Sequence, residues 1–295
     1  GSQQCLDFAG KLFLDPGDVV LCESPSYLGA LNAFNAYQPK FVEVPTDNGG
    51  LIPEELDKIL ETTPNCKFIY VIPDFQNPTG RTWSMERRQK FMEVVNKHNL
   101  PVLEDNPYGE LRYEGTILPS LKSMDTKGLV MFLGTFSKIF CPGLRLGWIA
   151  AEHSLLSEFV KIKQSADLHT SNFDQGVADA YMEQYDLDEH VKEIVALYKH
   201  RRDLILESME KYFPAGTEWT HPEGGLFLWL TFPEGVSARK VFNKCIEMKV
   251  AGVIGDAFYP NQKTDRSMRI NYSNMPDDRI VEGIQRMAKA IKECM

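Results

Sequence analysis

Short apolar runs of strand length alternate with segments of helical periodicity along the first two-thirds of the chain. Such alternation predicts βαβ units, in which the strands form a mostly parallel sheet and the helices cover it. In chain order the segments are strand-like Val19–Cys22, helical Leu28–Tyr37, strand-like Phe41–Val44, helical Glu54–Leu60, strand-like Lys67–Ile72, helical Ser84–His98, and strand-like Val102–Glu104 and Leu129–Leu133. The expected fold class is therefore α/β.

The last third of the chain has a different pattern. A long charged run, Leu187–Tyr212, carries apolar residues at helical spacing and is predicted to be one helix. The elements expected after it are strand-like Gly225–Phe232, helical Ala238–Met248, strand-like Met268–Tyr272 and helical Asp277–Glu293. We therefore expect a large α/β domain over residues 1–187 and a smaller α+β domain over residues 188–295.

Composition limits the partners that such a chain can have. The formal net charge of −9 argues against a general nucleic-acid surface, which needs clustered lysine and arginine. We find no apolar run of membrane-spanning length and no signal-peptide pattern, so we expect a cytoplasmic protein without membrane contact. The six cysteines form no C-x-x-C pair and the six histidines form no ligand-spaced cluster, so no metal site is predicted.

The polar turn after the apolar run Leu129–Leu133 holds the most informative residues. Two hydroxyls and an amine occur in Thr135-Phe136-Ser137-Lys138, and Arg145 follows seven residues after the lysine. A lysine amine forms a Schiff base with an aldehyde, while hydroxyls and a planar guanidinium bind a phosphate dianion. This grouping suits an aldehyde cofactor that carries a phosphate. Taken alone, it is equally consistent with a lysine in an ordinary polar turn.

Asp105 comes at the end of an apolar segment that begins at Pro101. Its carboxylate is therefore expected at the carboxyl end of a buried strand, where ligands collect in open α/β sheets. There it can keep the ring nitrogen of a pyridine cofactor protonated, which makes the ring a better electron acceptor. A helix cap or a turn residue is the structural alternative.

Three more residues can contact the ring of such a cofactor. Asn77 and Tyr108 both donate hydrogen bonds and both follow strand-like runs, so either can bind a phenolic oxygen. Tyr27, at the start of a helical run, offers a ring that can stack on the pyridine. Each has a structural alternative, because Asn-Pro dipeptides are common turn formers and a single aromatic is usually packing material.

Two candidate regions lie near the ends of the chain. Gly1-Ser2-Gln3-Gln4 precedes an amphipathic run, and the free N–H groups of a helix start can receive a phosphate. Arg269 lies in a segment where Met268 and Ile270 alternate with polar residues, and its guanidinium can pair bidentately with a carboxylate. A plain helix N-cap and a surface strand arginine are the alternatives.

In this order, the residues resemble the fold-type I pyridoxal-phosphate aminotransferases. They resemble in particular the subgroup of 2-aminoadipate and kynurenine aminotransferases and the aminotransferase-like domains of MocR-type regulators. The motifs that carry the resemblance are Gly1-Ser2-Gln3-Gln4, Glu23-Ser24-Pro25-Ser26-Tyr27, Pro73-Asp74-Phe75-Gln76-Asn77-Pro78-Thr79-Gly80, Glu104-Asp105-Asn106-Pro107-Tyr108, Ser137-Lys138 with Arg145, Gly224-Gly225-Leu226-Phe227-Leu228-Trp229, and Arg269. The resemblance implies the PLP-transferase fold, pyridoxal 5'-phosphate as cofactor, and a homodimer.

The resemblance also implies a role for each candidate residue. Lys138 would bind the cofactor's aldehyde and act as general base, and Asp105 would pair with the ring nitrogen. Asn77 and Tyr108 would bind the phenolic oxygen, and Tyr27 would stack on the ring. The implied phosphate ligands are Ser2, Gln3, Thr135, Ser137 and Arg145.

By the same resemblance, Arg269 and Asn77 would bind the substrate. Two features depart from the family pattern. Asn106 stands where a second acid is more common, which removes one charge but leaves Asp105 in place. Full-length relatives also have roughly a further hundred residues in front, including the first strand of a seven-stranded sheet. We therefore expect that strand to be absent and the sheet edge at Leu144–Ala150 to be exposed.

The activity implied is the transfer of an amino group between an L-amino acid and a 2-oxo acid by a ping-pong mechanism. Two alternatives stay open at this point. The sensing domain of a MocR-type regulator would bind the same cofactor and amines without turnover, and a β-lyase or racemase of the same fold would use the same residues. Near relatives act on aromatic, acidic and branched amino acids, so the sequence indicates no single substrate.

Overall fold

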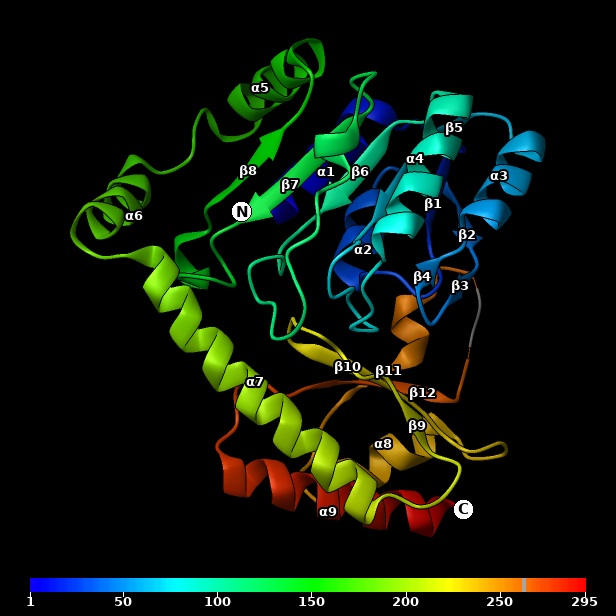
Figure 1. The fold of residues 1–295 in the computed structure, drawn as a ribbon. Helices are drawn as coiled ribbons and strands as arrows, with labels where there is room; N and C mark the ends of the chain where they lie inside the picture. Colours follow the sequence, from blue (N-terminus) through cyan, green and yellow to red (C-terminus); the bar gives the residue numbers. More distant parts are fainter. Residues whose placement is uncertain (262–263) are drawn as a thin grey trace.

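A six-stranded sheet forms the centre of the first half of the chain (Figure 1). The computed structural model describes residues 1–261 and 264–295. The strand order is β2-β1-β5-β6-β7-β8, in which the first five strands are parallel and β8 is antiparallel to β7. The strands are β1 (Val19–Glu23), β2 (Lys40–Val44), β5 (Cys66–Val71), β6 (Val102–Asp105), β7 (Val130–Thr135) and β8 (Gly147–Ala150). The predicted mostly parallel α/β sheet is confirmed.

Helices cover both faces of this sheet, and each face has its own apolar core. On one face α3 and α4 pack against alternate strand residues such as Ile69 and Val71. On the other face α1, α2 and α5 pack against the intervening residues, among them Phe68 and Tyr70. The helices are α1 (Ser2–Phe13), α2 (Leu28–Asn35), α3 (Pro53–Thr62), α4 (Met85–His98) and α5 (His153–Asp167). Strands buried on both faces explain the nearly continuous apolar runs in the sequence.

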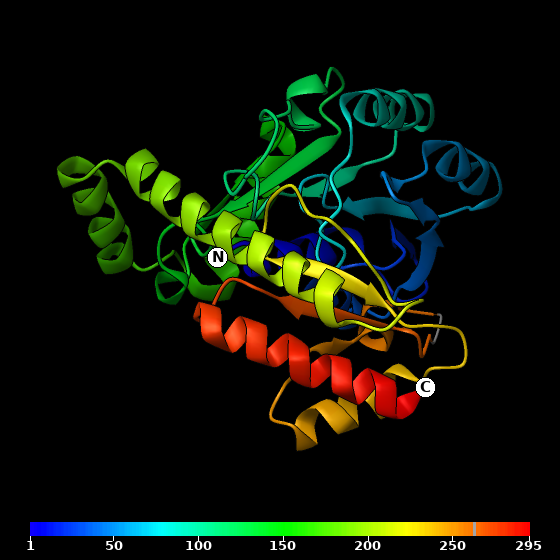
Figure 2. The ribbon, with the colours of Figure 1, turned by 60° about the horizontal axis from the view of Figure 1, so that its bottom comes forward.

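A second, antiparallel sheet lies in the last third of the chain, with the order β11-β12-β10-β9. One face of it packs against α7, α8 and α9 around buried residues such as Leu228, Met268 and Ile284. Figure 2 shows α7 and α9 running side by side over this sheet. The elements are α7 (Leu187–Tyr212), β9 (Glu218–Trp219), β10 (Phe227–Thr231), α8 (Ala238–Glu247), β11 (Val253–Ile254), β12 (Ser267–Asn271) and α9 (Asp277–Cys294). The division of the chain into domains at residues 187 and 188 stays a prediction.

Several elements have no counterpart among the predicted ones. They are α5 (His153–Asp167), α6 (Asn172–Gln184), the short ribbon of β3 (Thr46–Asp47) and β4 (Gly50–Leu51), β9, β11, and the 3-10 helices η1 (Lys122–Met124), η2 (Pro142–Leu144) and η3 (Gly255–Phe258). The helix α6 buries only Ala178 and leaves Phe173 79% exposed, so its apolar residues do not mark a buried face. Figure 1 shows it beside the start of α7, away from the sheet.

The strand β8 is one of the two outer strands of the six-stranded sheet, β2 being the other, and it lies in the segment Leu144–Ala150, for which an exposed edge was predicted. Trp148 on this strand is 37% exposed. Of the helices in residues 1–261 and 264–295, none combines the length and the apolar character that a membrane crossing requires. The same residues contain no group of three or more His, Cys, Asp or Glu side chains placed to hold a metal ion.

Candidate active site

A pocket of about 450 Å³ lies where β6 and β7 end, and every predicted site residue lines it. Those residues are Ser2, Gln3, Tyr27, Asn77, Asp105, Tyr108, Thr135, Ser137, Lys138, Arg145 and Arg269. Ile72, Pro107, Pro142 and Phe227 complete the lining. A second hollow, of about 550 Å³, is lined by Arg81, Trp219 and His221 among others and contains none of the predicted residues. The fold thus brings together side chains that are far apart in the sequence.

Asp105 is the last residue of β6, and its carboxylate is almost fully buried. Successive strand residues point to opposite faces, so Asp105 shares the face of Leu103, which packs against α1 and α2. The Tyr70 hydroxyl donates to Asp105 Oδ2 at 2.8 Å, while Oδ1 is buried and has no hydrogen-bond partner among the described residues. Burial raises the pKa of Asp105 to about 6, against the hydrogen bond from Tyr70 and the charge of Lys138, which lower it. A buried carboxylate oxygen without a donor fits the protonated ring nitrogen of a pyridine.

Lys138 lies in the turn after β7, and its amine shares the pocket with Asp105. Burial lowers the pKa of Lys138, and the positive charges of Arg145 and Arg269 lower it further, although Asp105 acts in the opposite direction. A lower pKa increases the fraction of neutral amine, which is the form that attacks an aldehyde.

Hydroxyl, guanidinium and backbone N–H groups gather on one side of Lys138. Thr135 Oγ1 lies 3.0 Å from Ser137 Oγ, and Arg145 Nη1 donates to the same Ser137 oxygen at 3.4 Å. The helix α1 starts here at Ser2, close to β8 because residue 147 is glycine: a Cβ at this position would lie 2.6 Å from the Ser2 nitrogen. Free N–H groups at a helix start, with hydroxyls and a guanidinium, form a suitable cradle for a phosphate.

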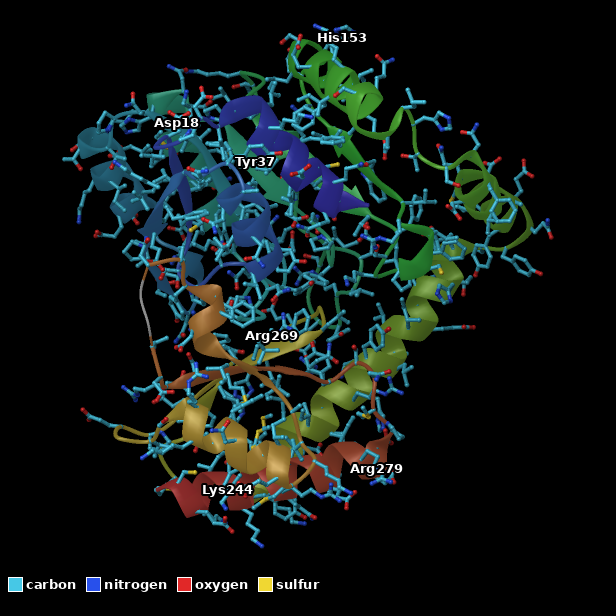
Figure 3. The ribbon with its side chains drawn as sticks, turned by 180° about the vertical axis from the view of Figure 1, so that it is seen from behind. Asp18, Tyr37, His153, Lys244, Arg269 and Arg279 are labelled. Atoms are coloured by element: carbon cyan, nitrogen blue, oxygen red, sulfur yellow. The ribbon has the colours of Figure 1, made fainter. Side chains whose placement is uncertain are left out.

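The other side of the pocket holds a second guanidinium, which comes from the antiparallel sheet. Arg269 alternates on β12 with the buried residues Met268 and Ile270, so it faces away from their core. Its Nη1 donates to Asn77 Oδ1 at 2.9 Å, and its guanidinium lies 4.1 Å from the ring centre of Phe227. The Nε atom is buried without a hydrogen-bond partner among the described residues. Figure 3 places Arg269 where the two sheets meet.

Asn77 also contacts Tyr108, the other residue predicted to bind a phenolic oxygen. Its Nδ2 donates to the Tyr108 hydroxyl at 3.4 Å, so Asn77 bridges Tyr108 and Arg269. Tyr108 is buried, and this burial raises the pKa of its phenol well above the usual range. The Tyr108 hydroxyl therefore keeps its proton near neutral pH and can donate it to an oxygen in the pocket.

Glu23 and Gln76 belong to the motifs that carry the family resemblance, but no role was predicted for either; both hold the segment that carries Asn77. Glu23 ends β1 fully buried; its carboxylate accepts from the Ile72 backbone N–H at 3.0 Å and from Trp83 Nε1 at 3.2 Å. Gln76 Nε2 donates to the Pro25 carbonyl at 2.8 Å. Burial raises the pKa of Glu23 to about 7. The sequence signals for Glu23 are its place at the start of a motif and its position directly after an apolar run, as for Asp105.

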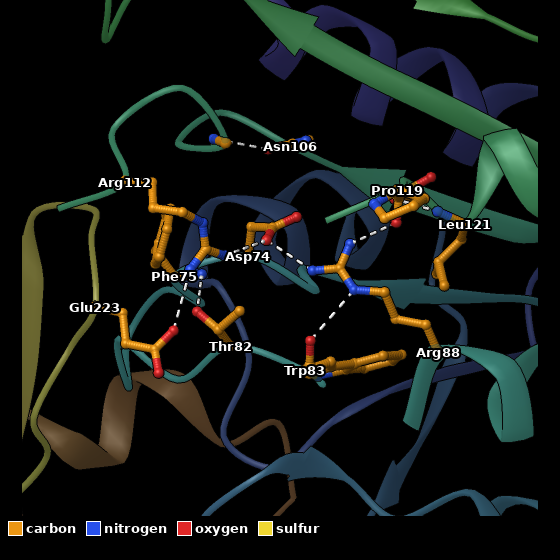
Figure 4. A network of polar contacts seen from close by, with 12 residues as sticks. Asp74, Phe75, Thr82, Trp83, Arg88, Asn106, Arg112, Pro119, Leu121 and Glu223 are labelled. Carbon is orange, nitrogen blue, oxygen red and sulfur yellow. Dashed lines mark hydrogen bonds and ion pairs between the residues drawn. The ribbon is translucent and has the colours of Figure 1, made fainter. Parts of the chain in front are cut away.

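An ion-pair network, drawn in Figure 4, holds the start of the same segment. Asp74 Oδ1 accepts from Arg88 Nη2 at 2.7 Å and from Arg112 Nη2 at 3.4 Å. Arg88 is fully buried, and Arg112 also pairs with Glu223 at 3.0 Å, just before the strand β10. The guanidinium of Arg112 lies over the ring of Phe75 at 4.8 Å. The network therefore connects the Asn77 segment with the antiparallel sheet.

The fold and this pocket define a pyridoxal-phosphate enzyme of the α/β type, because an amine, a buried carboxylate and a group of hydroxyl, guanidinium and helix-start N–H donors meet at the carboxyl ends of parallel strands. The family model for aminotransferase class I and II matches residues 1–287. The chain belongs to this family, and it is a pyridoxal-phosphate-dependent aminotransferase.

Three known proteins illustrate the similarity. Aromatic-amino-acid aminotransferase 1 of Thermococcus litoralis is 44% identical over 299 residues, which span 100% of this chain and 72% of that protein. A crystal structure of Pyrococcus horikoshii kynurenine aminotransferase, in complex with PMP, KYN and KYA, is 43% identical with a TM-score of 0.96 and covers 99% of this chain and 74% of its own. A crystal structure of LysN, an α-aminoadipate aminotransferase from Thermus thermophilus, is complexed with N-(5'-phosphopyridoxyl)-L-leucine. It is 35% identical with a TM-score of 0.96, and the match covers 100% of this chain and 76% of the LysN chain.

Proposed function

We propose that this aminotransferase binds pyridoxal phosphate in the pocket around Lys138. The observation that carries the proposal is the buried Oδ1 of Asp105, which has no donor among the described residues although it borders a pocket that also contains an amine and a phosphate cradle. When bound, the cofactor withdraws electrons from the bonds at the α-carbon of the substrate. Asp105 keeps the ring nitrogen protonated, and that proton supplies the missing hydrogen bond.

The remaining residues bind and orient the cofactor. Asn77 and Tyr108 donate to the phenolic oxygen, and Tyr27 packs against one face of the ring. The phosphate is held by Ser2, Gln3, Thr135, Ser137 and Arg145, which combine the N–H groups at the start of α1 with hydroxyl donors and one full positive charge. Lys138 would hold the cofactor's aldehyde through its amine, and its Nζ would move the α-proton of the substrate.

Arg269 holds the substrate by its α-carboxylate. Asn77 Oδ1 accepts from Nη1 at 2.9 Å and fixes the plane of the guanidinium, and Phe227 packs against its face. The remaining N–H groups of the fork match the two oxygens of a carboxylate. Because Arg269 binds the carboxylate, loss of that carboxylate is disfavoured. We therefore consider decarboxylation the least favoured of the reactions that enzymes of this fold catalyse.

We further propose that the preferred amino donors are aromatic amino acids, with a 2-oxo acid as acceptor. The proposal is supported by the 44% and 43% identity to relatives named for aromatic amino acids and kynurenine. It is also supported by the apolar lining of Ile72, Pro107 and Phe227. The test compares kcat/KM for three amino donors, phenylalanine, kynurenine and 2-aminoadipate, each with 2-oxoglutarate as the acceptor. A kcat/KM higher for aminoadipate would contradict the proposal.

We also propose that the protein forms a homodimer and that it works in the cytoplasm. The outer strand β8, with Trp148 partly exposed, and the exposed Phe173 of α6 supply apolar surface that a second copy can cover. All six cysteines are free, which suits a reducing compartment. Light scattering after size-exclusion chromatography tests the assembly, and a monomer at micromolar concentration would contradict it.

The transfer itself is tested in a single half-reaction. Holo-protein is mixed with an excess of phenylalanine and no 2-oxo acid, while the visible absorbance of the cofactor and the released oxo acid are followed. We expect loss of the visible band with one oxo acid formed for each bound cofactor. A visible band that persists without oxo acid would indicate binding without transfer, as in a sensing domain.

A further inference from the structure

A tyrosine outside the pocket contacts the carboxylate of Asp105, which lines the pocket. Tyr70 lies on β5, the parallel neighbour of β6, and it shares the sheet face of Asp105. Its hydroxyl donates to Asp105 Oδ2 at 2.8 Å. Both side chains are buried, and the Tyr70 ring packs edge-on against Phe34 with 5.7 Å between centres. The packing of the ring and the depth of burial fix the position of the hydroxyl.

This hydrogen bond makes the two oxygens of Asp105 unequal. Oδ2 is occupied by Tyr70, whereas Oδ1 is buried and without a donor among the described residues. A carboxylate held through one oxygen has little freedom to turn, so Oδ1 remains the oxygen available to a donor in the pocket.

We infer that Tyr70 is a positioning residue, which orients the Asp105 carboxylate and keeps it ionised for the ring nitrogen of pyridoxal phosphate. The inference rests on the proposed function of the pocket. It concerns a residue that does not line the pocket and that no sequence motif marked.

The charges around Asp105 support this role. Burial raises the pKa of Asp105 to about 6, and the hydrogen bond from Tyr70 is the largest effect that lowers it, followed by the charge of Lys138. The titratable groups that face Asp105 are Tyr70 of β5, Lys138 after β7, Tyr27 before α2, Tyr108 after β6 and Cys5 of α1. Without the Tyr70 hydroxyl, burial acts with less opposition and the pKa of Asp105 rises further.

The test is the binding of pyridoxamine phosphate to apo-protein between pH 5.5 and 8.5. This ligand has no aldehyde, so its affinity does not depend on a covalent link to Lys138. Tyr70→Phe removes one oxygen and keeps the ring. A rise of about one unit in the Asp105 pKa corresponds to the loss of one hydrogen bond to a charged group. We then expect affinity to fall about fivefold at pH 6 relative to native protein and to be nearly unchanged at pH 8.

Two further variants make the result specific. Tyr37→Phe is the matched control, because the Tyr37 hydroxyl also donates to an aspartate, Asp7 Oδ1, at 2.9 Å but lies outside the pocket. Figure 3 labels Tyr37 among the helices, away from Arg269. The control is expected to bind like native protein at every pH. In an Asp105→Asn background, Tyr70→Phe is expected to have no pH-dependent effect, since the group through which it acts is gone.

The possible results separate the inference from the proposed function. In one result, Asp105→Asn weakens binding, but Tyr70→Phe changes the dissociation constant by the same factor at every pH. The inference about Tyr70 is then wrong, and the proposed site stands. A pH-dependent effect that persists in the Asp105→Asn background would also refute the inference. If native protein fails to bind pyridoxamine phosphate, or Asp105→Asn binds equally well, both are wrong.

Discussion

Replacing Arg269 by lysine keeps a positive charge in the pocket and removes the planar fork. In the native protein the guanidinium is held by Asn77 at 2.9 Å and packs at 4.1 Å and 5.1 Å from the ring centres of Phe227 and Phe258. A lysine ammonium retains neither this packing nor a two-pronged match to a carboxylate. The substitution therefore isolates the geometry of carboxylate binding from its charge.

The expected loss follows from the number of hydrogen bonds. A hydrogen bond to a charged group contributes about 1.5–3 kcal/mol. If the lysine loses one of the two bonds to the substrate's α-carboxylate, kcat/KM falls about 10- to 150-fold. We expect most of the loss in KM, because the carboxylate is bound before and during the reaction alike.

The assay compares two substrates and two variants. One substrate is phenylalanine with 2-oxoglutarate, and the other is phenethylamine, which lacks the α-carboxylate. Arg266→Lys is the matched control, because Arg266 is exposed and donates only to the Phe232 carbonyl among the described residues. Carboxylate binding by Arg269 is refuted if Arg269→Lys leaves kcat/KM for phenylalanine unchanged, or if it lowers the rate with phenethylamine by the same factor.

Three other predictions concern the scaffold of the site. Gly147→Ala would place a Cβ 2.6 Å from the Ser2 nitrogen, and overpacking of about 1–3 kcal/mol should weaken pyridoxal phosphate binding, in contrast to Gly283→Ala, where the space is open. Asp74→Ala leaves the buried Arg88 without its carboxylate and should lower the free energy of unfolding by about 3–5 kcal/mol in urea. As the control, Glu55→Ala removes the exposed ion pair with Lys58 and should change the free energy of unfolding by less than about 1 kcal/mol. Burial raises the folded pKa of Glu23 to about 7. The contribution of this residue to the free energy of unfolding is therefore fully present below the unfolded pKa and is lost as pH rises through about 7. Apo-protein should be less stable at pH 8 than at pH 5, and Glu23→Gln should reduce that difference. Equal stability at both pH values, or an Asp74→Ala variant as stable as Glu55→Ala, would contradict these accounts.

Most of the six-stranded sheet could be predicted because its inner strands β1, β5, β6 and β7 are buried on both faces, whereas the edge strand β2 was marked by its short apolar run alone. Five apolar runs correspond to β1, β2, β5, β6 and β7, and the helices between them have clear periodicity. The helices α5 and α6 were not predicted, since α5 buries only Phe159 and α6 only Ala178. The strands β9 and β11 have two residues each, which is too short for an alternating pattern to emerge.

The meeting of the candidate side chains in one pocket could be predicted where a residue follows a strand and carries a distinctive group, as Asp105, Asn77 and Lys138 do, while their roles stay a prediction. The residues that hold these groups in place were not predictable. Tyr70 reads as one more apolar position within β5, and only the neighbouring strand shows that its hydroxyl meets a carboxylate. Likewise Asp74, Arg88 and Arg112 are scattered charges in the sequence, and their contacts depend on how the two sheets come together.

Lys138 is the residue on which the whole site depends, and reduction of the holo-protein tests directly whether it carries the cofactor. Borohydride converts a lysine–pyridoxal link into a stable amine, and digestion followed by mass spectrometry locates it. We predict a phosphopyridoxyl group on the peptide that contains Lys138, and none in Lys138→Arg protein treated in the same way. A label on another lysine, with Lys138 unmodified, would contradict it.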